Sequence, residues 1–205
     1  NFETLIKTME LLKKNNINFW TTTTLNKKNI NDIEFVLSIA KKYNTYANFV
    51  LIQFFDKVIE SNSLPDYQKV QQLELIPDDK DIRAAFEKLI KLKKDGEPIG
   101  SSFEFLNFMK SWDDYKILMS SKNYGIKCVA GKLYCHLFAD EKLYTCGHYI
   151  DAIDKIDIKK SGFINGFNDL QKIPNCQSCR VACDTENNLI YNLNLKSIFN
   201  WLSKM

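Results

Sequence analysis

The cysteines are the feature that most restricts how this chain can fold. All six lie between residues 128 and 183 of a 205-residue sequence. Cys176 and Cys179 are separated by two residues, a spacing with which two thiolates can bind one metal from a single tight turn. Thiolates are soft ligands that select zinc or iron-sulfur clusters. The spacing therefore predicts a metal centre in the C-terminal part of the chain.

Cys128 and Cys146 can supply two further ligands. They flank two apolar runs, residues 132–138 and 143–145, which are joined by a polar turn at residues 139–142. Such a pattern predicts a β-hairpin, which brings its own ends together. We therefore expect a four-thiolate site at the open end of a hairpin, closed by a later loop. Cys183 is an alternative to Cys176 as a ligand, and Cys135 is expected to be structural.

Disulfides and structural zinc are the competing explanations for clustered cysteines. Disulfides are typical of small secreted domains, whereas this lysine-rich chain is 45% apolar and can form a core without covalent cross-links. Zinc sites with four cysteines use the same paired spacing as iron-sulfur sites. Spacing alone therefore leaves zinc and iron-sulfur open.

The order of these motifs resembles the auxiliary-cluster region of radical S-adenosylmethionine (radical SAM) enzymes of the SPASM/Twitch type. The elements are Cys128-x-Ala130-Gly131, an apolar strand, an acidic turn, Leu143-Tyr-x-Cys146, then Cys176-x-x-Cys179 and Cys183. The resemblance implies an auxiliary [4Fe-4S] cluster held by cysteines of this set. The one-cluster Twitch version is the better match, because two clusters would need more thiolates than the six present.

The N-terminal residues predict alternating helices and strands. Apolar residues recur at helical spacing over 2–15 and 32–43, and residues 17–25 and 47–55 are rich in β-branched and aromatic side chains. This order predicts a parallel α/β unit, in which ligands bind at the carboxyl ends of the strands. The unit is similar to the later half of the radical SAM partial barrel. By that resemblance the residues facing S-adenosylmethionine are Thr24, Asn26, Gln53 and Phe54.

We expect three segments along the chain. Residues 1–60 would form an incomplete part of the barrel, and residues 61–115 a helical linker segment with a helix over 82–94 and another starting at Ser101 or Ser102. Residues 116–205 would form a small α+β cysteine-rich domain, ending in an apolar helical stretch. The predicted fold class is α/β, a partial (β/α) barrel followed by an iron-sulfur domain with a β-hairpin.

Two departures from the family pattern limit the predicted activity. The chain contains neither the Cys-x-x-x-Cys-x-x-Cys loop that holds the catalytic cluster nor the Gly-Gly-Glu run that binds the cofactor's amino group. The resemblance therefore implies the C-terminal portion of a longer enzyme. S-adenosylmethionine and a second [4Fe-4S] cluster would belong to the full-length protein, and this chain alone should be inactive.

The composition limits the classes of partner that the chain is expected to bind. The net charge is only +3, and Arg83 and Arg180 are the only arginines, which argues against nucleic acid. The sequence has no apolar run of the roughly 20 residues that cross a bilayer, so we expect no membrane partner and a cytoplasmic protein. The resemblance implies an oxidoreductase acting on a peptide or small molecule, with a reductant protein such as flavodoxin or ferredoxin. The alternative function is a non-catalytic Cys₄ zinc-binding structural or interaction module.

Overall fold

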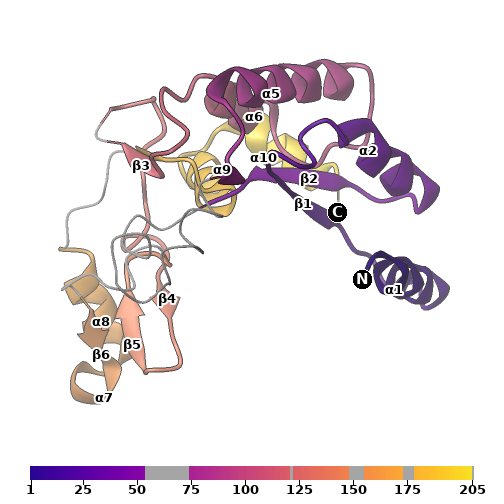
Figure 1. Cartoon of the computed structure of the whole chain (residues 1–205). Helices are drawn as coiled ribbons and strands as arrows, with labels where there is room; N and C mark the ends of the chain where they lie inside the picture. Colours follow the sequence, from indigo (N-terminus) through magenta and orange to yellow (C-terminus); the bar gives the residue numbers. More distant parts are fainter. Residues whose placement is uncertain (54–73, 121, 148–154, 173–177, 205) are drawn as a thin grey trace. The chain divides into compact units, whose positions relative to one another are not determined.

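The computed structural model describes residues 1–53, 74–120, 122–147, 155–172 and 178–204. The chain divides into two compact units, one made of residues 1–116 and 199–205 and the other of residues 117–198. Figure 1 shows the elements of both units. No helix in the described ranges is both long and apolar enough to cross a membrane.

The first unit begins with the alternating helices and strands that the sequence predicts. These elements are α1 (Phe2–Lys14), β1 (Thr21–Leu25), α2 (Ile33–Lys42) and β2 (Ala47–Leu51). The strands pair in parallel, with Thr21 opposite Ala47 and Leu25 opposite Leu51. A helix that joins two neighbouring parallel strands is the expected α/β connection.

One face of this small sheet is buried and the other is more open. Ala47, Phe49 and Leu51 of β2 are buried, as is Leu25 of β1. Thr22 and Thr24 of β1 are exposed, because successive side chains of a strand point to opposite faces. Helix α2 contributes apolar side chains at helical spacing to the core, namely Ile33, Leu37 and Ala40.

Two further helices, α5 (Asp79–Lys94) and α6 (Phe103–Lys110), pack against each other in the same unit. Helix α5 begins earlier than the predicted residue 82, so the acidic residues ahead of it form its first turn, where they suit the helix dipole. Ser102 caps α6, and its hydroxyl accepts a hydrogen bond from the Phe105 N–H at 3.1 Å. Phe86 and Phe105 then meet edge to face in the core.

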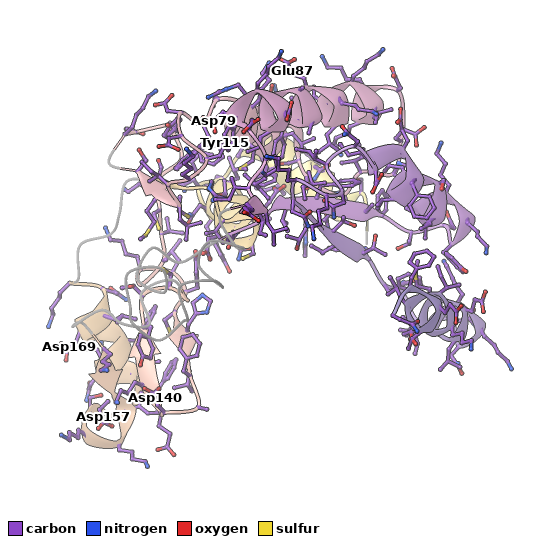
Figure 2. All side chains as sticks on the ribbon, in the orientation of Figure 1. Asp79, Glu87, Tyr115, Asp140, Asp157 and Asp169 are labelled. Carbon is purple, nitrogen blue, oxygen red and sulfur yellow. The ribbon has the colours of Figure 1, made fainter. Side chains whose placement is uncertain are left out.

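The predicted hairpin is present in the second unit, but its first strand is shorter than the predicted run of residues 132–138, because residues 131–133 form a turn. β4 (His136–Leu137) and β5 (Lys142–Tyr144) pair antiparallel, with His136 opposite Tyr144. Asp140 holds the turn, since its carboxylate accepts hydrogen bonds from the Tyr144 hydroxyl at 2.7 Å and from the Lys142 N–H at 3.2 Å. Figure 2 shows Asp140 beside this hairpin.

The second unit also contains elements that the sequence analysis did not predict. Strand β6 (Ile156–Asp157) pairs with β5 and is followed by the helices α7 (Ile158–Ser161) and α8 (Phe163–Leu170). Strand β3 (Met119–Ser120) pairs antiparallel with β7 (Ser178–Cys179). The expected apolar helical stretch, residues 189–202, covers the end of α9 (Ala182–Tyr191) and the whole of α10 (Leu195–Leu202), whose residues from 199 onward belong to the first unit.

The chain is therefore a mixed α/β protein, as predicted. Its described strands form small sheets of two or three strands, and they form no closed barrel. The partial barrel, and the domain limits at residues 60 and 115, stay predictions.

Candidate metal centre

Cys128 precedes a tight turn that folds the chain back on itself. The Lys132 N–H donates to the Val129 carbonyl at 3.0 Å, and the Gly131 N–H donates to the Tyr134 carbonyl at 2.6 Å. Gly131 has a φ of +74°, in the left-handed region that glycine adopts without strain. The Cys128-x-Ala130-Gly131 sequence is therefore a turn whose shape depends on its glycine.

This turn packs against the segment that carries Cys146. A β-carbon on Gly131 would lie 2.7 Å from Thr145 Cγ2, and both Thr145 and Cys146 are buried. The pairing of His136 with Tyr144 is at the open end of the hairpin, and Thr145 and Cys146 follow it directly along the chain. The open end of the hairpin therefore brings the Cys128 turn beside Cys146.

Cys179 is positioned by the second small sheet of this unit. It lies on β7 opposite Met119 of β3. The next residue, Arg180, is buried, and it donates from its backbone N–H to the Leu118 carbonyl at 3.0 Å and from Nε to the Ile117 carbonyl at 3.1 Å. These bonds to the β3 segment hold the Cys179 backbone in place.

Helix α9 binds both cysteine-bearing segments through one face. The Thr185 hydroxyl donates to the Cys179 carbonyl at 2.9 Å. The buried Asn188 side chain accepts the Val129 N–H at 3.0 Å, directly after Cys128. Residues three and four apart on a helix share a face, so a single helix surface fixes the positions of Cys128 and Cys179 together.

The pKa of Cys179 is shifted by burial and by several neighbouring groups. Burial raises the pKa of its thiol to about 12, and a backbone hydrogen bond from Val181 offsets part of that rise. The negative charges of Asp184, Cys128 and Cys146 raise this pKa further. Cys128 and Cys146 therefore act on the Cys179 thiol through their charge.

Tyr134 lies among the same groups. Burial raises the pKa of its hydroxyl far above the ordinary value, and the negative charges of Asp184, Cys128, Cys179 and Cys146 add to the rise. The hydroxyl also donates a long hydrogen bond of 3.4 Å to Asp184 Oδ1. The charges of all three thiols therefore act on the Tyr134 hydroxyl.

The remaining cysteines are placed differently. Cys135 is partly exposed, and burial of its thiol is the cause that raises its pKa. Cys183 lies on α9 and is exposed as a residue, although partial desolvation and then the charge of Asp184 raise the pKa of its thiol. Cys176 lies outside the described residues.

The chemistry of the donors fits zinc or an iron-sulfur cluster, because thiolate sulfur is the preferred ligand of both. All five described cysteines are thiols, with no disulfide between any two of them. Within the part of the chain that the structure describes, no group of three or more His, Cys, Asp or Glu side chains is arranged so that it could hold a metal ion. The described residues therefore form no metal-binding site, and the four-thiolate centre stays a prediction.

The residues predicted to face S-adenosylmethionine lie at one edge of the sheet in the first unit. Thr24 is exposed near the end of β1, Asn26 follows β1, and Gln53 follows β2 and is partly exposed. Because Leu25 pairs with Leu51, Asn26 and Gln53 both leave the sheet at its carboxyl edge. Phe54 lies outside the described residues.

Asn29 fixes the loop after β1, whereas the cap of the following helix α2 is Asp32. The Asn29 side chain accepts the Asn26 N–H at 2.8 Å and donates to the Thr24 carbonyl at 2.9 Å. Asn26 Oδ1 in turn accepts the Lys28 N–H at 2.8 Å, forming an Asx turn. The Asn26-x-x-Asn29 spacing is the signal that could have indicated this loop.

Tyr134, Asp184 and Asn188 are the residues near the candidate ligands that the sequence analysis missed. Asp184 and Asn188 are four residues apart, as expected for two groups on one helix face. The relation of these residues to the cysteines is visible only in the structure, where α9 packs against the turn that follows Cys128.

Comparison with known proteins found no relative of this chain. No family model, curated protein or solved structure matches the chain. Its function must therefore be inferred from the residues and their geometry.

Proposed function

We propose that this chain is the C-terminal portion of a radical SAM enzyme, in which Cys128, Cys146 and Cys179 bind an auxiliary [4Fe-4S] cluster of the Twitch type. The supporting observation is that α9 hydrogen-bonds to both cysteine-bearing segments, through Thr185 to the Cys179 carbonyl and through Asn188 to the N–H that follows Cys128. Clusters of this type are commonly held by four cysteines. Cys176 is the fourth ligand that the spacing favours, and Cys183 is the alternative.

The parallel pairing of β1 and β2 supports a place for the first unit in the later part of a partial barrel. Thr24, Asn26 and Gln53 would contact S-adenosylmethionine at the carboxyl edge, together with Phe54. Hydroxyl and amide groups can hydrogen-bond to the ribose and carboxylate of such a ligand. S-adenosylmethionine and the second cluster of the full-length enzyme would supply the radical chemistry.

The residues of the second unit would hold and shield the auxiliary cluster. The ring of Tyr134 stacks on Tyr191 of α9, with 5.8 Å between the ring centroids. Tyr191 is 47% exposed, so any shielding of the cluster from solvent would come from Tyr134, and exposure to solvent is one of the factors that set cluster properties. The substrate would be a peptide or small molecule, and a flavodoxin or ferredoxin would serve as reductant.

Anaerobic reconstitution of the chain with iron and sulfide tests the proposal. We expect broad visible absorption, with iron and sulfide bound in the ratio of a [4Fe-4S] cluster. Cys128→Ala, Cys146→Ala and Cys179→Ala should each lose the cluster. Cys135→Ala is the matched control, since it removes a thiol from the same hairpin, and it should keep the cluster. Loss of the cluster in Cys135→Ala would show that the ligand set is wrong.

A Cys₄ zinc module is the second candidate function, because the same thiols would bind zinc. Tight zinc binding, with no sulfide retained after reconstitution, would favour this candidate. The same cysteine variants would then lose zinc. Cys176→Ala and Cys183→Ala, compared side by side, identify the fourth ligand for either metal.

A further inference from the structure

Helix α1 of the first unit leaves most of its surface uncovered (Figure 1). Met9 is the only buried residue of this helix. Three of its large apolar side chains, those of Phe2, Leu5 and Leu11, are more than half exposed. A helix of this length is marginally stable in water without packing partners. The exposed surface of α1 is therefore a candidate for a contact that a single copy of the chain does not make.

Four charged side chains alternate in sign along one side of α1. Glu3, Lys7, Glu10 and Lys14 follow one another at steps of four, three and four residues, so they form a continuous stripe on the helix. All four residues are exposed. None of them forms an ion pair with any residue that the structure describes, and the carboxylate of Glu10 accepts one hydrogen bond, from the Tyr43 hydroxyl at 3.3 Å. The charges of the stripe are thus available to a partner.

The order of these charges is complementary to itself. In an interface with two-fold symmetry, residue i contacts residue j of the second copy and residue j contacts residue i. If two copies of α1 pair antiparallel with the axis at the middle of the stripe, Glu3 lies opposite Lys14 of the second copy, and Lys7 lies opposite Glu10. Every charge of the stripe then faces the opposite sign. A parallel pair would instead place each charge beside its own copy, which is repulsive.

Leu11 adds an apolar contact beside the stripe. It lies four residues after Lys7 and three residues before Lys14, so it shares their side of the helix, and it is 60% exposed. In the antiparallel pair the two copies of Leu11 would lie about 7.5 Å apart along the helix direction, given the rise of about 1.5 Å per residue. Covering both leucines removes apolar surface from water, which favours association.

We propose that α1 is a self-association surface, through which two copies of this chain pair antiparallel about a two-fold axis. The charge order of α1 argues for a second copy as the occupant, because that order complements only its own reverse. The inference goes beyond the proposed function and is independent of it, since it concerns the first unit and involves no metal.

Two variants of the 205-residue chain, each with a stripe of a single sign, test the pairing. Lys7→Glu with Lys14→Glu makes the stripe wholly acidic, and Glu3→Lys with Glu10→Lys makes it wholly basic. Sedimentation equilibrium should show a dimer for the wild type and a dissociation constant raised at least about tenfold for each variant alone, because like charges would face each other. An equimolar mixture of the two variants should form a heterodimer, because every facing pair is then opposite in sign.

Lys91→Glu with Lys94→Glu is the matched control. Both lysines are exposed on α5 of the same unit, and the change in net charge equals that of the acidic variant. The control should dimerise as the wild type does. Leu11→Ala is a further variant that keeps a good helix former at an exposed position, and it should also weaken the dimer.

The outcomes decide the inference without reference to the metal centre. A wild-type chain that stays monomeric at about 1 mM overturns it. A mixture of the acidic and basic variants that stays monomeric also overturns it, as does a control that loses the dimer, since net charge alone would then be the cause. If circular dichroism shows that the stripe variants do not fold, Leu11→Ala decides, and an unchanged dissociation constant in that variant overturns the inference. Cluster or zinc binding by the cysteines is measured separately, so the proposed function stands or fails on its own.

Discussion

Gly131 and Thr145 approach each other so closely that no β-carbon fits between them. A β-carbon on Gly131 would lie 2.7 Å from Thr145 Cγ2, a distance that folded proteins essentially never show. Thr145 precedes Cys146, and Gly131 closes the turn that follows Cys128. The approach of two predicted ligands thus depends on the absence of one side chain.

Gly131→Ala should destabilise the fold and weaken metal binding. The left-handed backbone alone costs about 1–3 kcal/mol for a residue other than glycine, and the new methyl group would also force Thr145 away. We expect a lower free energy of unfolding in urea and less bound metal per chain after reconstitution.

Gly125→Ala is the control for this prediction. Gly125 has a similar φ of +81°, but a β-carbon there would meet no atom within 4 Å. Gly125→Ala should lower the free energy of unfolding, because its backbone is also left-handed, but it should bind as much metal per chain as the wild type. Equal metal content in the two variants would show that the contact between Gly131 and Thr145 does not matter for the site.

Asn188→Ala should also impair the site, through the loss of a buried acceptor. The Val129 N–H would lose its partner, and an unsatisfied buried donor costs about 1–3 kcal/mol. The matched control is Asn192→Ala on the same helix. Asn192 is exposed, and its side chain donates to the Lys127 carbonyl at 2.7 Å. Chemical denaturation should show the larger loss for Asn188→Ala, and a larger loss for Asn192→Ala would contradict the assigned role of α9.

Elements with a strong local pattern could be predicted from the sequence. The hairpin was predictable because two apolar runs surround a polar turn, and β1 and β2 were predictable from their β-branched and aromatic residues. Strand β6 has only two residues, Ile156 and Asp157, so it carries no periodic signal. It is a strand because the neighbouring β5 offers a free edge for pairing.

The break between α9 and α10 has a similar explanation. Leu193 adopts a positive φ of 58° after the end of α9. Leucine is not a residue that indicates a helix end, so the apolar spacing through this region predicted one continuous stretch.

The candidate site was predictable only where its residues carry their own chemistry. Cysteine spacing indicated Cys128, Cys146 and Cys179 because thiols have few other uses in such a pattern. Tyr134 and Asp184 have ordinary roles in most proteins, and their place near the thiols follows from the packing of α9. Tertiary contacts between distant segments leave no local mark in a single sequence.

The thiol of Cys179 should be unusually unreactive in the metal-free chain. Its pKa is raised from 9.0 to about 12, chiefly by burial, so below pH 12 the thiolate is a minor form. Alkylation by iodoacetamide, followed by mass spectrometry of the peptides, should modify Cys179 more slowly than the exposed Cys183. The Cys179 rate should rise about tenfold for each unit of pH, because only the thiolate reacts.

The raised pKa of Cys179 also predicts how the free energy of unfolding of the metal-free chain changes with pH. A group whose folded-state pKa is raised contributes stability that is present below pH 9.0 and is lost as the pH rises toward about 12. The free energy of unfolding should therefore decline over that range, and Cys179→Ala should reduce the decline.

For the alkylation prediction, the rate of Cys179 alkylation in urea supplies the reference for the unfolded chain. A Cys179 rate that is the same in water and in urea would show that the thiol is not buried.

Asp140 should give the hairpin a dependence on acid pH. The hydrogen bond from the Tyr144 hydroxyl is the main cause that lowers the pKa of Asp140 below 3.8, although burial opposes it and the contacts with Lys142 add to it. A carboxylate with a lowered pKa contributes stability above its unfolded pKa, and this stability is lost as the pH falls through the lower folded value.

Tyr144→Phe should move the Asp140 pKa back toward its ordinary range, and Asp140→Asn should make the hairpin insensitive to acid in this range. Titration of the Asp140 side chain and the Tyr144 amide by nuclear magnetic resonance measures both effects, with Asp169→Asn as the control. An Asp140 that titrates at its ordinary pKa in the wild-type chain would contradict the hydrogen bond on which the turn depends.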